Sequence, residues 1–288
     1  VERLKREFMA VWESRDLDEA KEFLGMTISR SGGTLRLDQC AYLDKVLKRL
    51  KMHDCKVVQT PLPEGYKPED NKEPVDPERR QRYQIVIGSL LYLMLGTRPD
   101  IAYAVIKMSQ FSANPSQDHL NRAMHICRYL AGTRKYSLVY QRNTNKGLLA
   151  YTDSDWAENL SNSVDDQQTS VRRRSTTGYF VKLANGIVNW HSHAQKTIAL
   201  SSTEAEYMAL SDTSRQIVWI KNIFSELGFD LPAIPICGDN QGSIFIATNP
   251  ITERRSKHID IRYHYIREKV ARGDIETFFI PGTENPAD

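Results

Sequence analysis

The sequence predicts a mixed α/β protein in which a sheet flanked by helices follows a smaller, mostly helical part. Between residues 83 and 130, apolar residues recur at helical spacing and prolines stand at the breaks. After about Lys146, short apolar strands alternate with helices, which is typical of sheets covered by helices. We therefore divide the chain into residues 1–140 and 141–288, since 288 residues suffice for two ordinary domains.

The composition indicates a soluble, intracellular globular protein. Hydrophobic residues make up 40% and charged residues 26% of the chain, and the net charge of +3 permits a nucleic-acid partner without requiring one. The four cysteines are scattered singly, which predicts reduced thiols. No apolar run approaches the roughly 20 residues that span a bilayer, so we expect no membrane partner. The start at Val1, without methionine, suggests a piece of a longer protein.

The first part begins with helical spacing and a hairpin pattern. Apolar residues predict a helix over 2–12, and two alternating runs around Gly32-Gly33 predict a β-hairpin over 22–37. Five prolines between residues 60 and 82 indicate a linker. The remaining predicted elements of this part are helices over 41–50, 83–95, 100–111 and 119–130.

The second part predicts the order β-β-β-α-β-α-α-β. Asn185-Gly186 marks a hairpin between the second and third strands. A mixed sheet with helices on its faces is the expected arrangement. The strands are predicted over 147–153, 177–183, 187–191, 234–237 and 275–280, and the helices over 201–227, 241–247 and 259–271.

Four carboxylates take positions from which they can meet at one edge of this sheet. Asp153 ends the first strand, Asp239 follows the fourth, Glu206 lies in the first turn of the long helix, and Asp288 follows the last strand. Hydrolysis of a phosphodiester with two Mg²⁺ ions requires several carboxylates that converge on one point. Strand ends and a facing helix would hold such groups rigidly.

Each carboxylate also has a structural explanation. Asp153 and Asp155 fit turn chemistry at a strand end. Asp239 before Asn240 fits the N-cap of a helix, and Asp288 fits an exposed terminal residue. The case for a site therefore rests on the set of positions.

Glu206 has a structural explanation of its own. Thr203-x-x-Glu206 fits a helix capping box, which would give Glu206 a purely structural role. Ser201-x-x-Glu204 fits the same box and would leave Glu206 free.

Several long motifs occur in a fixed order along nearly the whole chain. They are YTDSDWA (151–157), RSTTGY (174–179), ALSSTEAEY (199–207), KHIDIRYH (257–264) and IPGTENPAD (280–288). These motifs resemble the ribonuclease H of copia-type retrotransposons. Upstream, KEFLGM (21–26), IGSLLY (87–92) and TRPDI (97–101) resemble the end of the reverse transcriptase in that family, with its thumb and connection.

The resemblance implies a ribonuclease H-like fold and a metal-binding catalytic set of Asp153, Glu206, Asp239 and Asp288. It favours Glu206 over Glu204, and it implies accessory roles for Asp155 and for His258. The implied reaction is cleavage of the RNA strand of an RNA–DNA hybrid by a metal-activated water. Two Mg²⁺ ions, replaceable by Mn²⁺, are the implied cofactors. The implied partners are the hybrid and the rest of the Pol polyprotein, in a cytoplasmic virus-like particle or in the nucleus.

Two basic clusters are candidates for contacts with phosphates of a hybrid. One comprises Arg172, Arg173 and Arg174, and the other comprises Arg254, Arg255 and Lys257. Solvated loops would give the same pattern. His191 and His193 alternate on a predicted strand but lack the further ligands that a zinc site needs. Trp156 and Trp190 are expected in the core.

Three other functions were weighed against this one. The Tyr-x-Asp-Asp motif of the family's polymerase is absent, so we expect no DNA synthesis by this chain alone. A catalytically inert nucleic-acid-binding or assembly fragment of a decayed element is the main alternative. An integrase of the DDE type is a poor match, because Glu206 stands between the two aspartates instead of after both.

Overall fold

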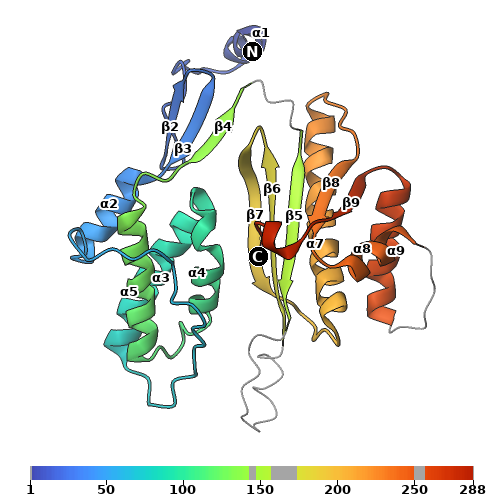
Figure 1. The fold of residues 1–288 in the computed structure, drawn as a ribbon. Coiled ribbons are helices and arrows are strands. Elements are labelled where there is room, and N and C mark those ends of the chain that lie inside the picture. Colours follow the sequence, from blue (N-terminus) through green and yellow to red (C-terminus); the bar gives the residue numbers. More distant parts are fainter. Residues whose placement is uncertain (1, 143–146, 157–173, 250–256, 288) are drawn as a thin grey trace.

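The computed structural model describes residues 2–142, 147–156, 174–249 and 257–287, with only the backbone for 257–263. These residues form two sheets with helices packed against them, which confirms the predicted mixed α/β class (Figure 1). The division into two domains near residue 140 stays a prediction. Two separate hydrophobic cores lie on either side of it, one built from residues 43–130 and one from residues 148–275.

The first sheet is antiparallel and has four strands in the order β1-β2-β3-β4. The predicted hairpin is present, and Gly32 and Gly33 form its turn with φ of 57° and 77°. The sequence did not predict β4, although the first part is mostly helical as expected. The short β4 pairs with β3 across roughly a hundred residues of chain, and local patterns carry no information on such pairing. The strands are β1 (Glu22–Phe23), β2 (Met26–Ser31), β3 (Thr34–Asp38) and β4 (Leu138–Gln141).

The helices between residues 40 and 132 enclose the core of the first part, whereas the helix over Glu2–Val11 has no buried residue. Leu47, Leu90, Ile126 and Leu130 are fully buried among them. The helices are α1 (Glu2–Val11), α2 (Cys40–Arg49), α3 (Pro77–Gly96), η1 (Pro99–Ile101), α4 (Ala102–Ser109) and α5 (Gln117–Gly132).

The predicted linker over 60–82 extends too far, because α3 already begins at Pro77. Asp76 is the N-cap of this helix, and its side chain accepts hydrogen bonds from the amides of Glu78 and Arg79. Proline is compatible with the first helical position, where its missing N–H has no intrahelical partner anyway. The last proline of the segment therefore starts a helix instead of extending a loop.

The TRPDI motif is explained by an ion pair of a buried arginine. Arg98 is 3% exposed and donates to both carboxylate oxygens of Asp100, at 2.9 and 2.6 Å. It also donates to the hydroxyl of Thr133, and the Tyr129 hydroxyl donates to Asp100. This network ties η1 to the end of α5.

The second sheet has five strands in the order β7-β6-β5-β8-β9. β5, β6 and β7 are antiparallel neighbours, whereas β5 pairs with β8, and β8 with β9, in parallel. The first of these strands was predicted to end at Asp153, but its pairing with β6 continues to Asp155 opposite Thr176. The strands are β5 (Leu149–Asp155), β6 (Thr176–Leu183), β7 (Gly186–Ala194), β8 (Ile234–Gly238) and β9 (Ile275–Phe279).

The helix α7 packs along this sheet. Tyr207, Leu210 and Ile217 of α7 are buried against Ala150 and Ile236 of the strands. The order of elements agrees with the predicted one. The helices are α7 (Ser202–Glu226), α8 (Gln241–Thr248), α9 (Lys257–Ala271) and η2 (Gly282–Glu284). Across the described ranges, no helix has both the length and the apolar character needed to cross a membrane.

The two parts of the chain are in contact at the β6–β7 hairpin. Ala184 and Asn185 take the positive φ values of its turn, 51° and 65°, so Gly186 is not one of the two turn residues. Gly186 instead lies against Tyr140, whose hydroxyl donates to the carbonyl of Ile187 at 2.7 Å. Further along β7, the Trp190 indole donates to the carbonyl of Met94 in α3 at 3.0 Å.

Candidate metal-binding active site

The carboxyl ends of β5 and β8 meet at one edge of the second sheet. The two strands are parallel, with Ala150 opposite Ile236 and Tyr151 opposite Cys237. Asp153 therefore stands two residues beyond the last position of β5 that pairs with β8, and Asp239 directly follows β8. Parallel neighbours bring such residues to the same edge.

The third carboxylate comes from the first turns of α7. Ser201 is the N-cap of this helix and accepts from the amide of Glu204 at 3.1 Å, while Glu204 accepts from the amide of Leu200 at 2.9 Å. Of the two capping boxes that the sequence allowed, the structure thus uses the residues Ser201 and Glu204. Glu206 is not needed for capping.

Asp239 is not the N-cap of the helix that follows it. The N-cap of α8 is Asn240, whose side chain accepts from the amide of Ser243 at 2.9 Å. The ordinary explanation of the Asp239-Asn240 pair therefore applies to the asparagine. The aspartate is left for the site.

Asp153, Glu206 and Asp239 form the carboxylate cluster. One carboxylate oxygen of each lies within 4.8 Å of those of the other two. Glu206 is 7% exposed, and the two aspartates are half-buried. Oxygen ligands at such spacing fit a hard divalent cation such as Mg²⁺. Within the described ranges, no other group of three or more His, Cys, Asp or Glu side chains converges in this way.

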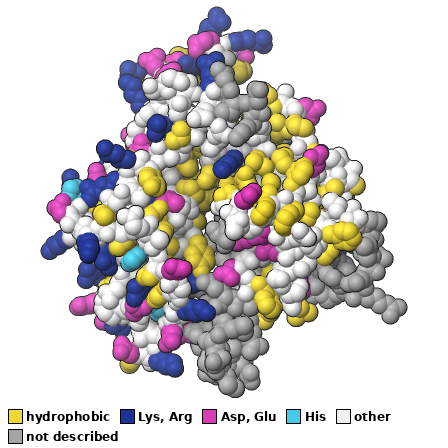
Figure 2. Space-filling model, viewed as in Figure 1, with side chains coloured by type: hydrophobic (Ala, Val, Ile, Leu, Met, Phe, Trp, Pro, Cys, Tyr) yellow, Lys and Arg dark blue, Asp and Glu magenta, His cyan; other side chains and the backbone are white. Residues whose placement is uncertain are grey.

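The electrostatics of the cluster favour a cation. Burial is the main cause that raises the pKa of Glu206, and together with the neighbouring carboxylates of Asp153 and Asp239, and against the opposing hydrogen bonds from Ser154, it brings the pKa to about 8. Like charges this close oppose each other's ionisation. A divalent cation would reverse that balance, because it attracts all three carboxylates. In the space-filling view, acidic side chains gather near the middle of the molecule, beside the hollow between its two parts (Figure 2).

Ser154 connects β5 directly to the carboxylate of Glu206. Its amide donates to Glu206 Oε1 at 3.0 Å, and its hydroxyl donates to the same oxygen at 2.8 Å. Ser154 is a site residue that was not predicted from the sequence. Its position between Asp153 and Asp155 was the available signal.

The C-terminal segment lies against the cluster. Asn285 is 6% exposed and donates through its side chain to the carbonyl of Thr152 at 3.1 Å. A Cβ at Gly282 would stand 3.1 Å from Asp239 Oδ2, and a Cβ at Gly178 would stand 3.4 Å from the carbonyl oxygen of Ala287. Gly178 is the partner of Asp153 in the β5–β6 register. The segment thus passes next to two of the three carboxylates.

Asp288, the fourth predicted ligand, lies outside the described residues. Its preceding residue, Ala287, lies beside the β5–β6 pair that carries Asp153. The role of Asp288 stays a prediction.

Comparison with known proteins places the chain in a family, although no family model matches it. It is 36% identical, over an alignment of 295 residues that covers the whole chain, to the retrovirus-related Pol polyprotein from transposon TNT 1-94 of Nicotiana tabacum. It is also 36% identical over 278 residues, 95% of the chain, to that from transposon RE1 of Arabidopsis thaliana. The chain belongs to the copia-type retrotransposon Pol family. It spans about a fifth of these relatives, 21% and 18% of their lengths.

Solved structures similar to this Pol chain include two kinds of protein. The match to ribonuclease H1 from Halobacterium salinarum covers 49% of this chain and 91% of that protein, with 18% identity and a TM-score of 0.34. The foamy viral protease-reverse transcriptase in complex with dsDNA covers 91% of the chain and 44% of its own length, with 12% identity and a TM-score of 0.45.

The other predicted site residues of the Pol chain are only partly described. Asp155 is exposed at the end of β5, where it pairs with Thr176 of β6. Arg174 is half-buried and stands two residues before Thr176. Both therefore lie at the end of the β5–β6 pair that carries the cluster. Arg172, Arg173, Arg254 and Arg255 fall outside the described residues, and the side chains of Lys257 and His258 are not described.

The histidines of β7 belong to a different contact. His193 Nε2 lies 3.1 Å from Asp212 Oδ2 of α7, and Arg215 also pairs with this aspartate. The rings of His191 and His193 lie 4.7 Å apart, and burial lowers the pKa of His191. This arrangement ties β7 to α7. Trp156 was expected in the core but is 47% exposed, because it follows the end of β5.

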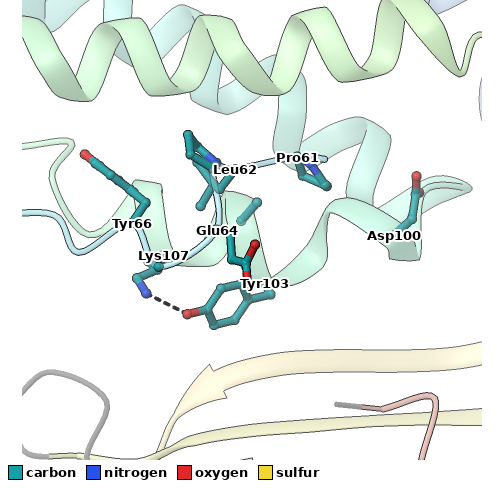
Figure 3. Close-up of a pocket in the computed structure, with 10 residues that line it drawn as sticks. Pro61, Leu62, Glu64, Tyr66, Asp100, Tyr103 and Lys107 are labelled. Carbon is teal, nitrogen blue, oxygen red and sulfur yellow. Dashed lines mark hydrogen bonds between the residues drawn. The ribbon is translucent and has the colours of Figure 1, made fainter. Parts of the chain in front are cut away.

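A cavity of about 350 Å³ lies in the first part of the Pol chain, away from the carboxylate cluster. It is enclosed by the proline-rich segment over 61–66 and by residues of η1 and α4. Tyr103 and Lys107 lie on its side facing the second sheet, and Lys107 donates to the Tyr103 hydroxyl at 2.6 Å (Figure 3). None of the carboxylates of the cluster lines it.

Proposed function

We propose that this chain is a retroelement ribonuclease H that hydrolyses the RNA strand of RNA–DNA hybrids. The observation that carries the proposal is the carboxylate cluster, in which Asp153, Glu206 and Asp239 converge at one edge of a mixed sheet. These groups come from two strand ends and the start of a helix. Such elements are rigid supports for a metal site. Membership in the copia-type Pol family supports the same function.

The proposed cofactors are two Mg²⁺ ions, for which Mn²⁺ would substitute. When bound, such ions lower the pKa of a coordinated water and neutralise the charge that develops on the phosphate. Asp153, Glu206 and Asp239 would hold them, with Asp288 as a fourth ligand. These carboxylates orient the reactants and take no part as nucleophiles. Asp155 and His258 are proposed as accessory groups.

The hybrid would approach the edge of the sheet where the cluster lies. Arg174 stands at this edge and is a candidate for a phosphate contact. We extend the same role to Arg172, Arg173, Arg254, Arg255 and Lys257 as predictions from the sequence. The other proposed partner is the remainder of the Pol polyprotein, within a cytoplasmic particle or in the nucleus.

The test is cleavage of a hybrid with labelled RNA in Mg²⁺ or Mn²⁺, by the parent chain, Asp153→Asn and Glu206→Gln. Glu226→Gln is a matched control, because Glu226 is an exposed residue at the far end of α7. We expect the parent and the control to cut the RNA strand and both site variants to lose at least about a hundredfold in rate. Binding of the hybrid without cutting by the parent would contradict the proposal and favour an inert binding fragment.

A further inference from the structure

Ser154 reaches the cluster from the strand that supplies Asp153. Its hydroxyl and its amide both donate to Oε1 of Glu206, at 2.8 and 3.0 Å. The strand thus contributes in two ways at consecutive positions: Asp153 offers a carboxylate to the cluster, and Ser154 holds the carboxylate that α7 brings to it.

Without such a restraint, the Glu206 side chain would be poorly fixed. It has three rotatable bonds, and its carboxylate lies beside those of Asp153 and Asp239, which repel it when it is charged. Hydrogen bonds to a charged acceptor are the stronger kind. Two of them on one oxygen oppose a rotation of the carboxylate away from its neighbours.

We propose that Ser154 is a positioning residue that orients the carboxylate of Glu206 toward Asp153 and Asp239 for binding of a divalent cation. The inference rests on the proposed function only in assuming that the cluster takes such a cation. Residues that hydrogen-bond to metal ligands fix the orientation of those ligands, and their loss commonly weakens metal binding by 10- to 100-fold. Because the amide of residue 154 would remain in any variant, we expect a loss at the low end, about tenfold.

The experiment measures binding of Mn²⁺ alone to the full chain by electron paramagnetic resonance, for the parent, Ser154→Ala and Ser154→Thr. Ser214→Ala is a matched control, since this buried serine of α7 donates only to the carbonyl of Leu210 at 2.7 Å. Thermal unfolding without metal is recorded for each variant. We expect Ser154→Ala to bind Mn²⁺ about tenfold more weakly. Ser154→Thr, which keeps a hydroxyl, should retain most of the affinity, and Ser214→Ala should bind as the parent does.

Failure of this inference can be told from failure of the proposed function. A Ser154→Ala variant that binds Mn²⁺ as tightly as the parent overturns the role of Ser154, even if the parent cuts a hybrid. A parent that binds Mn²⁺ but cuts no hybrid overturns the function, and a tenfold loss in Ser154→Ala would still support the positioning role. A parent that binds no Mn²⁺ contradicts both.

Discussion

The backbone of Gly186 lies directly against the aromatic ring of Tyr140, which leaves no room for a side chain at that glycine. A Cβ there would stand 2.4 Å from the ring and 2.6 Å from the carbonyl of Val139. β4 and the start of β7 are thereby brought into close contact between the two parts of the chain.

We therefore expect Gly186→Ala to destabilise the chain by about 1–3 kcal/mol, the usual cost of forcing extra volume into a packed contact. The measurement is chemical denaturation. Gly147→Ala is the control, because nothing lies within 4 Å of a Cβ at that glycine. Equal stability of the two variants would show that the contact at Tyr140 yields without cost.

Loss of the Arg98 guanidinium should be among the more damaging single changes in the first part. Arg98→Ala would leave Asp100 without its bidentate partner and would remove the donor to Thr133. We expect a loss of about 1–3 kcal/mol, because the change removes a buried guanidinium that hydrogen-bonds to Asp100 and Thr133. Arg272→Ala is the control, because Arg272 is 64% exposed and pairs with Glu268 on the surface. That change should cost below about 1 kcal/mol.

The stability of the metal-free chain should fall as the pH rises, because of Glu206. Its pKa of about 8 in the folded chain exceeds the ordinary value of 4.5. The neutral form is thus favoured on folding, and the stability that it contributes is complete below pH 4.5 and is lost as the pH rises through 8. In EDTA, Glu206→Gln should therefore be more stable than the parent at pH 9, by on the order of a few kcal/mol.

At pH 5 the same variant should be close to the parent in its free energy of unfolding. Denaturation curves at both pH values provide the check, with Glu226→Gln as the control for the loss of an exposed glutamate from the same helix. If the difference in free energy of unfolding between Glu206→Gln and the parent is the same at pH 5 and pH 9, the raised pKa of Glu206 is contradicted.

Asn285 should control how firmly the C-terminal segment is held. Asn285→Ala removes the donor to the Thr152 carbonyl and the acceptor for the Ala287 amide. We expect a destabilisation of about 1–2 kcal/mol and faster hydrogen exchange at Ala287, since a buried carbonyl loses its partner. Thr283→Ala, a change at an exposed position of the same segment, should leave exchange at Ala287 unaltered. Unchanged exchange in Asn285→Ala would show that other contacts hold the segment.

The helices and the strands of the second sheet were predictable because their signals are local. The 25 residues of α7 and the alternation in β6 appear in short windows of sequence. β4 was not predictable, because its four residues pair with a distant strand. The exposure of Trp156 was not predictable either, because it depends on where β5 ends in the folded chain.

The positions of the site carboxylates were predictable from two strand ends and the start of a helix. The residues that hydrogen-bond to the site were not predictable. Ser154 bonds a residue 52 positions later, and Asn285 bonds one 133 positions earlier. Such partners are fixed by the packed fold and leave no trace in spacing. The choice between two capping boxes at α7 likewise needed the structure, because Ser201 and Thr203 both satisfy the pattern.

The separation of Asp239 from the helix cap at Asn240 has a consequence for the history of such sequences. Because the side chain of Asn240 caps the start of α8, a change at Asp239 would remove one of the proposed metal ligands and leave the helix its cap. A copy of the element with a substitution at this codon would lose the proposed activity but keep its fold. Inactivation and unfolding are then separate evolutionary events, and a silent copy would still provide a folded scaffold on which selection for another role can act.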